Sequence, residues 1–376
     1  MGTYMNHEVW IPQFEHPDVS GVTFGGFYMG KYHVSQPNAT ADNDNPDVAD
    51  NAAVGSVPAI SAPGKPAWRY INLLRARTAA ANLGVGYHLT TEFEWASMAM
   101  YAQLMGTMPH GNCGDTNPPS DVTYTDETAF IDRAAIARGA TYYAHLAGTG
   151  PNTWSHTHQA DGVFDIMGMW QWNDGPLLCP ASLNDNSTTP HAVTGAGGAG
   201  YPLVLGNLEV TLSGSPYGAS TSAAAGSLTD SAKAWTTDEF AGMFLYDSAG
   251  ALYYIDSNTA DTLSIDGADT PATGPYTVRR VVATDITSGM SSGNRILTLR
   301  NTDADLKAFA LPATSDGTGA TKYGNDGYWF APTALRGALR GGRWGGGARA
   351  GVFTLYLSDA PSISSSSIGL RVARSL

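Results

Sequence analysis

Residues 340–371 read RGGRWGGGARAGVFTLYLSDAPSISSSSIGLR, and their side chains fall into two interleaved sets. The first set, the frame, is small or apolar, as closely packed strands and turns require. The frame also includes Val372, which directly follows the quoted stretch. Its members are Trp344, Ala348, Ala350, Val352, Phe353, Leu355, Leu357, Ala360, Pro361, Ile368, Leu370 and Val372. The second, the mixed set, has no shared chemistry. It consists of Arg343, Gly345, Gly346, Arg349, Tyr356, Ser358, Asp359, Ile363, Ser365, Ser366 and Ser367.

The region from Val352 to Ala360 alternates between the two sets. Leu355 and Leu357 belong to the frame, whereas Tyr356 and Ser358 belong to the mixed set. This period of two predicts a strand with one face in the core and the other face free to vary. Composition alone favours an ordinary surface strand beside a serine-rich loop.

The frame resembles the C-terminal motif of the formylglycine-generating-enzyme branch of the C-type lectin fold, which reads R-G-G-S-W, then R-x-A, then G-F-R. The matching residues are 340–344, 349–350 and 369–371. Within this branch, the string W-x-x-G-A-x-A-G-V-F-x-L-x-L-x-x-A-P-S is most similar to the variable proteins of diversity-generating retroelements. In those proteins a reverse transcriptase rewrites template adenines, so that fixed positions near the C-terminus take many residue types. The mixed set falls on these positions, and its residue types can be reached from an asparagine codon by changing adenines.

This resemblance implies a ligand-binding protein whose mixed set forms one exposed patch. The implied partner is a protein or glycan on a target cell surface, and the implied location is a virion or a cell surface. Homo-oligomers or assembly into a virion also fit. Two other classes remain open, namely an enzyme and a structural virion component. A neighbouring reverse-transcriptase gene with an adenine-rich copy of this segment would distinguish the first class from the others.

The two enzyme alternatives have weak support. The sulfatase-modifying reaction of the family needs two cysteines, and the matching positions near Gly346 and Gly351 carry no thiol. Residues 289–293 match G-x-S-x-G around Ser291. A nucleophile elbow requires a strand before this motif and a helix after it, whereas residues 294–300 have the pattern of a strand. We therefore expect a hairpin turn at Ser291 and no catalytic residue.

Charge and hydropathy exclude further classes. The net charge is −13, which argues against nucleic-acid binding because that function needs a basic surface. The region from Arg336 onward nevertheless contains six arginines and one acidic residue. Of these, Arg340 and Arg371 belong to the family motif and are expected to be structural, whereas Arg343 and Arg349 are available to an anionic ligand. No apolar run approaches eighteen residues and no signal peptide is visible, so membrane insertion is not expected.

The rest of the chain predicts an α+β fold of the C-type lectin type with an inserted β module. Residues 25–34, 87–96 and 162–172 resemble the family's opening strands, second helix and tryptophan-rich turn. Residues 66–83 have the pattern of a helix, and Thr91 begins a second one in a capping box with Glu94. Short β-like runs occupy 243–246, 252–255, 262–265 and 276–281. We therefore expect a discontinuous domain of residues 1–200 and 286–376, interrupted by a β-rich insertion at 201–285 and joined at the glycine-rich residues 194–200.

No metal, cofactor or disulfide is expected. The acidic residues 42–47 lack the glycine and terminal glutamate of an EF-hand loop, so a solvated loop is favoured. His156 and His158 have no identifiable third ligand and are interpreted as polar loop residues. Gln171 stands where the family has Glu, which argues against the calcium site of some relatives. Cys113 and Cys179 have no metal-type or redox spacing; they are free to pair, but idle thiols are favoured.

Overall fold

The computed structural model describes residues 7–109, 133, 145–178, 203–205, 217–249, 251–265, 269–282, 286–287, 289–302, 306–331 and 336–375. Within these residues the fold is mostly β, with two α-helices, α1 (Leu73–Ala81) and α2 (Glu92–Met105). The chain therefore has a mostly β or α+β fold, which agrees with the predicted class at this coarse level. No helix in this part of the chain is long and apolar enough to cross a membrane.

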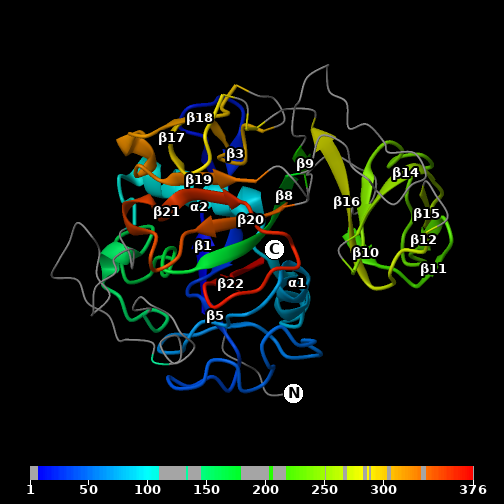
Figure 1. Cartoon of the computed structure of the whole chain (residues 1–376), viewed down its shortest axis with the longest axis horizontal. Coiled ribbons are helices and arrows are strands. Elements are labelled where there is room, and N and C mark those ends of the chain that lie inside the picture. Colours follow the sequence, from blue (N-terminus) through cyan, green and yellow to red (C-terminus); the bar gives the residue numbers. More distant parts are fainter. Residues whose placement is uncertain are drawn as a thin grey trace.

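The largest sheet extends through most of the molecule (Figure 1). Its strands are β8 (Trp170–Leu178), β9 (Leu203–Leu205), β10 (Tyr217–Ala219), β11 (Ser222–Ala224), β12 (Ser227–Thr229), β13 (Phe244–Tyr246), β14 (Leu252–Asn258), β15 (Thr262–Ile265), β16 (Pro275–Val282), β17 (Asn294–Leu299), β18 (Pro312–Asp316), β19 (Gly327–Phe330), β20 (Arg336–Gly341), β21 (Gly351–Leu357) and β22 (Ile368–Leu370). The spatial order is β11-β12-β15-β14-β13-β16-β9-β8-β20-β21-β19-β17-β18, with β10 beside β16 and β22 beside β8. The strand predicted from the alternation after Val352 is β21, which lies between β20 and β19 in this sheet.

A second sheet brings the beginning and the end of the described chain together. Its order is β1 (Glu8–Ile11), β4 (Phe27–Gly30), β23 (Val372–Arg374) and β7 (Tyr87–Leu89). Two short pairs complete the β structure, β2 (Phe14–Glu15) with β3 (Thr23–Phe24) and β5 (Val34–Ser35) with β6 (Ile60–Ser61). Strand β23 lies between β4 and β7, so residues more than 300 positions apart share one sheet.

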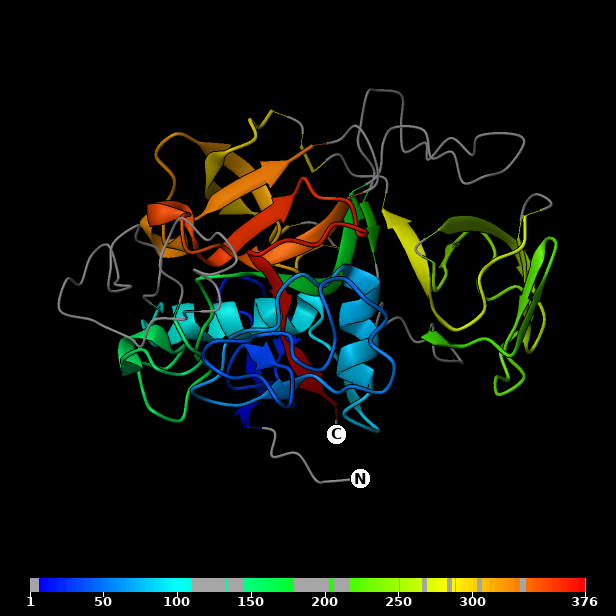
Figure 2. The same ribbon diagram turned by 60° about the horizontal axis from the view of Figure 1, so that its bottom comes forward.

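The two helices lie beneath the large sheet (Figure 2). Helix α2 begins with the predicted capping box, in which the Thr91 hydroxyl accepts from the Glu94 backbone N–H and the Glu94 carboxylate accepts from the Thr91 N–H. It ends at Gly106, whose φ of 67° is the left-handed conformation that favours glycine at a helix end. Its indole at Trp95 donates to the Val352 carbonyl, 2.7 Å away, and so attaches the helix to β21.

Helix α1 is shorter than the predicted helix at 66–83. Asn72 is the N-cap, with its side chain accepting from the Arg75 backbone N–H. Tyr70 has a φ of 56°, which is incompatible with a helix through this residue. The apolar pattern of residues 66–72 instead reflects burial of Trp68 and Ile71 in an irregular segment.

Two apolar cores lie in the body of the molecule, and each combines early and late residues. One contains Met29 and Trp95 together with Phe353. The other contains Trp68 and Leu73 together with frame residues such as Ile368. Early and late segments therefore contribute to the same cores.

The predicted β runs of the insertion correspond to β13, β14, β15 and β16, which lie to one side of the body in Figures 1 and 2. They enclose a third core around Trp235 and Phe240. Strand pairing, in addition to the covalent connection, joins the insertion to the body. Strand β16 pairs with β9, and β9 pairs with β8 of the body. Phe244 and Tyr246 also pack in the body's second core. The glycine-rich residues 194–200 lie outside the described part of the chain.

Candidate functional site

Most of the frame is buried, but Ala348 is exposed and Ala360 is partly exposed, contrary to expectation. Six of its largest members, Trp344, Val352, Phe353, Leu355, Leu357 and Ile368, are each no more than 4% exposed. All of these except Trp344, which lines a small cavity, pack in the two body cores through β21 and β22. Substitutions at these buried side chains are therefore expected to destabilise this end of the sheet.

All eleven residues of the mixed set are at least partly exposed. Arg343 and Arg349 lie at either end of the turn after β20, which includes the 3-10 helix η3 (Gly347–Arg349). Tyr356 is the one residue of β21 that is not buried. The predicted contrast between frame and mixed positions is therefore present in the exposure of the side chains.

An aromatic cluster joins several mixed positions. The Tyr356 ring lies 4.9 Å from the Trp170 ring and 6.2 Å from the Trp329 ring, measured between centroids. Parallel pairing of β19 with β21 places Trp329 opposite Tyr356. The backbone N–H of Trp170 donates to the Ser367 carbonyl, 2.9 Å away. Trp170 and Trp329 were not predicted as site residues, because only the strand register brings them to Tyr356.

The electrostatics near Tyr356 combine one acid with two cations. Burial raises the pKa of the Tyr356 phenol, and the charge of Asp359 raises it further, while Arg343 acts in the opposite direction. Burial likewise raises the pKa of Asp359 above its ordinary value, although Arg336 opposes the shift. Arg343 is connected to the tryptophan-rich turn by a parallel bridge with Gly168. Arg343, Tyr356, Asp359 and Ser367 are thus brought to one region.

Other mixed positions extend away from this region. The Arg349 carbonyl accepts from the Thr354 hydroxyl, and its side chain is exposed at the far end of the turn. Ile363 is 41% exposed in the loop before β22, in which Ser365 and Ser367 contact each other. The exposed mixed positions therefore lie on the 343–349 turn, at Tyr356 of β21 and on the 358–367 loop.

The two motif arginines are structural, as predicted. Arg340 is fully buried, pairs with Glu92 of α2 and donates to the Phe353 carbonyl. Arg371 is also fully buried and donates to the carbonyls of Gly30 and Phe164. Each guanidinium satisfies backbone groups from distant segments, which fixes the framework beneath the surface.

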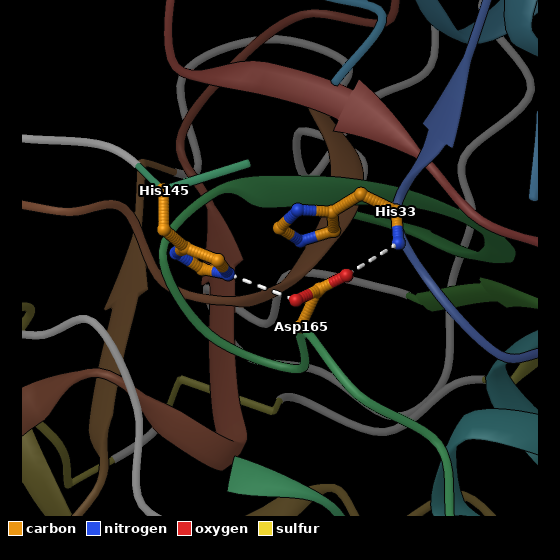
Figure 3. Close-up of side chains that lie close together, drawn as sticks. All are labelled: His33, His145 and Asp165. Carbon is orange, nitrogen blue, oxygen red and sulfur yellow. Dashed lines mark hydrogen bonds and ion pairs between the residues drawn. The ribbon is translucent and has the colours of Figure 1, made fainter. Parts of the chain in front are cut away.

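A buried polar centre lies under the same surface and was not predicted. His33, His145 and Asp165 are each no more than 4% exposed, and one potential ligand atom from each lies within 4.8 Å of the others (Figure 3). Asp165 Oδ1 accepts from His145 Nε2 at 2.8 Å, and Oδ2 accepts from the backbone N–H of His33 at 3.2 Å. The backbone N–H of Gly148 also donates to this carboxylate.

Two members of the centre have strongly shifted pKa values. Burial, with a smaller contribution from Arg371, lowers the pKa of His33 to about 3, so its imidazole is neutral. Burial acts to raise the pKa of Asp165, but the hydrogen bond from His145 and nearby positive groups outweigh this and lower it to about 2. The carboxylate is therefore ionised inside the protein.

Several expectations about single motifs are corrected. Asp44 is fully buried and pairs with Arg69 at 2.7 Å, so residues 42–47 do not form a purely solvated loop. His156 is buried as well, and its Nδ1 accepts from the Val163 N–H. His158 Nε2 contacts the Met108 carbonyl, so these two histidines do not converge on a common point. Cys113 and Cys179 lie outside the described residues.

The positions tied to the enzyme alternatives also have clear surroundings. Ser291 is exposed and lies in a turn directly before β17, so no helix follows it. At Gly351, which matches the region of the family's cysteine, a Cβ atom would lie 1.9 Å from Asp326 Oδ1. The Asp326 carboxylate thus fills the space that a side chain at this position would need.

No family model and no curated protein matches this chain.

Proposed function

We propose that this chain is a ligand-binding protein of C-type lectin fold, whose mixed set is diversified by a retroelement for attachment of a virus or a cell to its target. The observation that supports the proposal is the contrast within residues 343–368. The large frame residues are almost completely buried, whereas every mixed position reaches the surface. Substitutions at exposed positions change stability little, so such a scaffold carries many surfaces at nearly constant stability.

The chemistry of this version suits a polar or anionic ligand on a cell surface, either a protein or a glycan. Tyr356, which packs on the buried Trp170, and Trp329 offer aromatic area, and Arg343 and Arg349 offer exposed cations. Tyr, Trp and Arg are the residue types that dominate interface energetics. The glycine and serine positions add little area, so single-site binding is weak and display of several copies would multiply it by about 10²–10⁴.

Variation in the encoding gene provides the first test. We expect a neighbouring reverse-transcriptase gene with an adenine-rich copy of the segment that encodes residues 340–371. Sequences from a population should differ at the eleven mixed positions and keep frame residues such as Trp344 and Phe353. Substitutions spread evenly over frame and mixed positions would refute the proposal.

Binding provides the second test. Arg343→Ala combined with Arg349→Ala should reduce binding of the labelled protein to glycan arrays and intact cells at least tenfold, with an unchanged melting temperature. Arg133→Ala is the matched control, because Arg133 is an exposed arginine paired with Asp42, outside the mixed set. Tyr356 should be changed separately, since its ring packs against Trp170. Binding that survives the double change undiminished would exclude this surface.

The enzyme alternative predicts a different result. A serine hydrolase would lose turnover in Ser291→Ala, and we expect this variant to match the unchanged protein in esterase assays. The exposed turn and the strand that follows Ser291 support this expectation.

A further inference from the structure

The buried polar centre of His33, His145 and Asp165 offers more ligand capacity than its hydrogen bonds use. We propose that these three residues bind one divalent transition-metal ion, of which Zn²⁺ is the best match, at the base of the candidate ligand surface. The proposal is independent of the proposed function. It depends on geometry, the unpaired Nδ1 of His145 and a neighbouring cavity.

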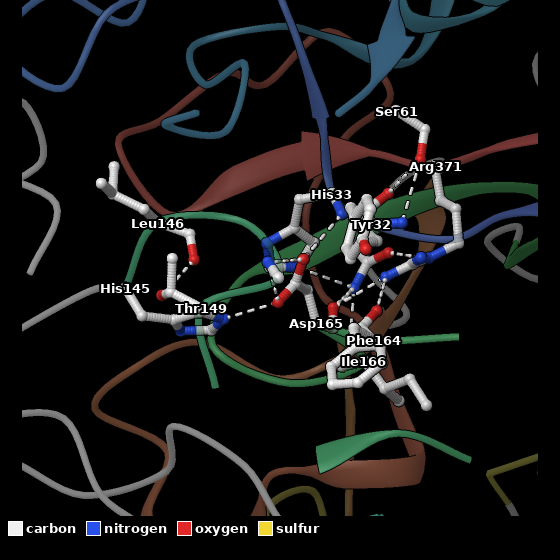
Figure 4. A network of polar contacts seen from close by, with 12 residues as sticks. Tyr32, His33, Ser61, His145, Leu146, Thr149, Phe164, Asp165, Ile166 and Arg371 are labelled. Atoms are coloured by element: carbon white, nitrogen blue, oxygen red, sulfur yellow. Dashed lines mark hydrogen bonds and ion pairs between the residues drawn. The ribbon is translucent and has the colours of Figure 1, made fainter. Parts of the chain in front are cut away.

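The first argument concerns the proton on His33. Its Nε2 lies 3.2 Å from Gln171 Nε2. That amide nitrogen already directs its two protons toward the carbonyls of Asp165 and Ile166, and the Gln171 amide oxygen accepts from Arg371. Figure 4 shows His33, Asp165, Ile166 and Arg371 close together around this point. An amide NH₂ has no acceptor to offer, so a proton on His33 Nε2 would face another donor. The imidazole therefore keeps a lone pair on Nε2.

The second argument concerns His145. Its Nε2 contacts the Asp165 carboxylate, whereas its buried Nδ1 has no hydrogen-bond partner in the described part of the chain. Buried polar atoms are nearly always paired, so an unpaired one requires an explanation. A neutral imidazole carries one proton, and a change of tautomer makes the lone pair of either nitrogen available to a cation.

The third argument concerns Asp165, which supplies the negative charge. Its φ of 55° is uncommon for a residue with a side chain, although Asp tolerates it better than most. Two histidines and one carboxylate are a common catalytic-type zinc ligand set, with a fourth position left for water. In such a site ligand atoms are about 3.3 Å apart at metal distances of roughly 2.0–2.2 Å. The ligand atoms here are within 4.8 Å, so small side-chain rotations suffice.

A cavity of about 10 Å³ adjoins both imidazoles and supplies the fourth position. This volume is close to what one water molecule needs. Its other lining residues include Gly168, Met169 and Trp344. A metal-bound water would therefore lie directly beneath the segment that carries Arg343, and the ion would join residues 33, 145 and 165 to the base of that surface.

Nearby positive charge opposes the binding of a cation, but both arginines are engaged elsewhere. Arg69 lines the cavity and pairs with Asp44 at 2.7 Å. Arg371 donates to the carbonyls of Gly30, Phe164 and Asp165. Each guanidinium is thus held by oxygen acceptors, which leaves the Asp165 carboxylate to neutralise the ion.

The experiment uses the full chain without a histidine tag, stripped with EDTA and dialysed against Zn²⁺. We expect one Zn²⁺ per chain by elemental analysis and a higher melting temperature than that of the stripped protein. Co²⁺ in place of Zn²⁺ should give visible absorption bands typical of four- or five-coordinate nitrogen and oxygen ligation. A wild-type chain that retains no Zn²⁺ and shows no melting shift would overturn the proposal without any variant.

Variants then locate the ion. His33→Gln and His145→Gln should each weaken Zn²⁺ binding at least tenfold, as even outer-shell changes at metal sites cost about 10–100-fold. His156→Gln is the matched control, because His156 is an equally buried histidine outside the centre. If either ligand variant fails to fold, Asp165→Asn tests the same centre while it preserves the size of the side chain. Equal Zn²⁺ affinity in wild type and folded ligand variants would contradict the assignment.

Discussion

At the scale of single residues, burial separates positions that tolerate change from positions that do not. Phe353 is fully buried, and its ring packs edge-on against Tyr323. Phe353→Ala should lower the free energy of unfolding by about 3–5 kcal/mol, because it removes a large apolar side chain and leaves a cavity. Urea denaturation measures this loss. Ile363→Ala, at an exposed mixed position, should change it by only about 0.5 kcal/mol or less.

Asp326 should make stability depend on pH. Burial raises the pKa of its carboxyl to about 7, although the N–H groups of Phe353 and Thr354 oppose the shift. The folded protein therefore keeps a proton that the unfolded chain loses near pH 4. This contribution to stability is present below that pH and is lost as pH rises toward 7, by about 1.4 kcal/mol for each unit of pKa difference.

Asp326→Asn measures this effect, since asparagine is always neutral and its carbonyl can still accept from the Phe353 N–H. The variant should gain stability relative to the wild type when urea denaturation is repeated from pH 5 to pH 8. A difference between the two proteins that stays constant over this range would contradict the assigned pKa shift.

At the scale of elements, a buried ionic group fastens the insertion to the body. Arg279 of β16 is fully buried and donates to Asp174 and to the Gly175 carbonyl. Arg77 of α1 pairs with the same Asp174. The Tyr246 ring lies 4.8 Å from each guanidinium. One carboxylate therefore holds two cations from opposite sides of the junction.

Removing that carboxylate should be costly. Asp174→Asn leaves both arginines without their shared counter-ion, and breaking a buried ion pair from one side costs about 3–5 kcal/mol. Because the Asp174 side chain is 11% exposed, we expect a loss of roughly 3 kcal/mol, the lower end of this range, in chemical denaturation. Asp42→Asn is the control, since its pair with Arg133 is exposed and should leave the midpoint unchanged.

The strands and helix ends show what local sequence can predict. The capping box at Thr91, the strand β21 and the runs of the insertion depend on neighbouring residues, and each was predicted from them. The predicted free face of β21 was not found, because every residue of this strand except Tyr356 is buried. The buried centre was not, because His33 and Asp165 are 132 residues apart. Burial of Asp44 was missed for the same reason, as its partner Arg69 is 25 residues away. Trp329 became a site residue only through its register with β21.

At the scale of the whole molecule, the insertion has its own core but shares a sheet with the body. Pairing of β16 with β9 and of β9 with β8 continues the hydrogen bonding across the junction. We therefore expect a single transition in differential scanning calorimetry of the wild type. Asp174→Asn should separate it into two. Two resolved transitions in the wild type would instead mean that the insertion unfolds as an independent domain.

Strand β23 has a consequence for how this protein is made. It occupies an interior position in its sheet, and the adjacent Arg371 holds carbonyls of residues 30, 164 and 165. None of these bonds forms until residues 371–374 have left the ribosome. The sheet of β1, β4 and β7 therefore remains without its interior strand until synthesis of the chain has reached residue 374.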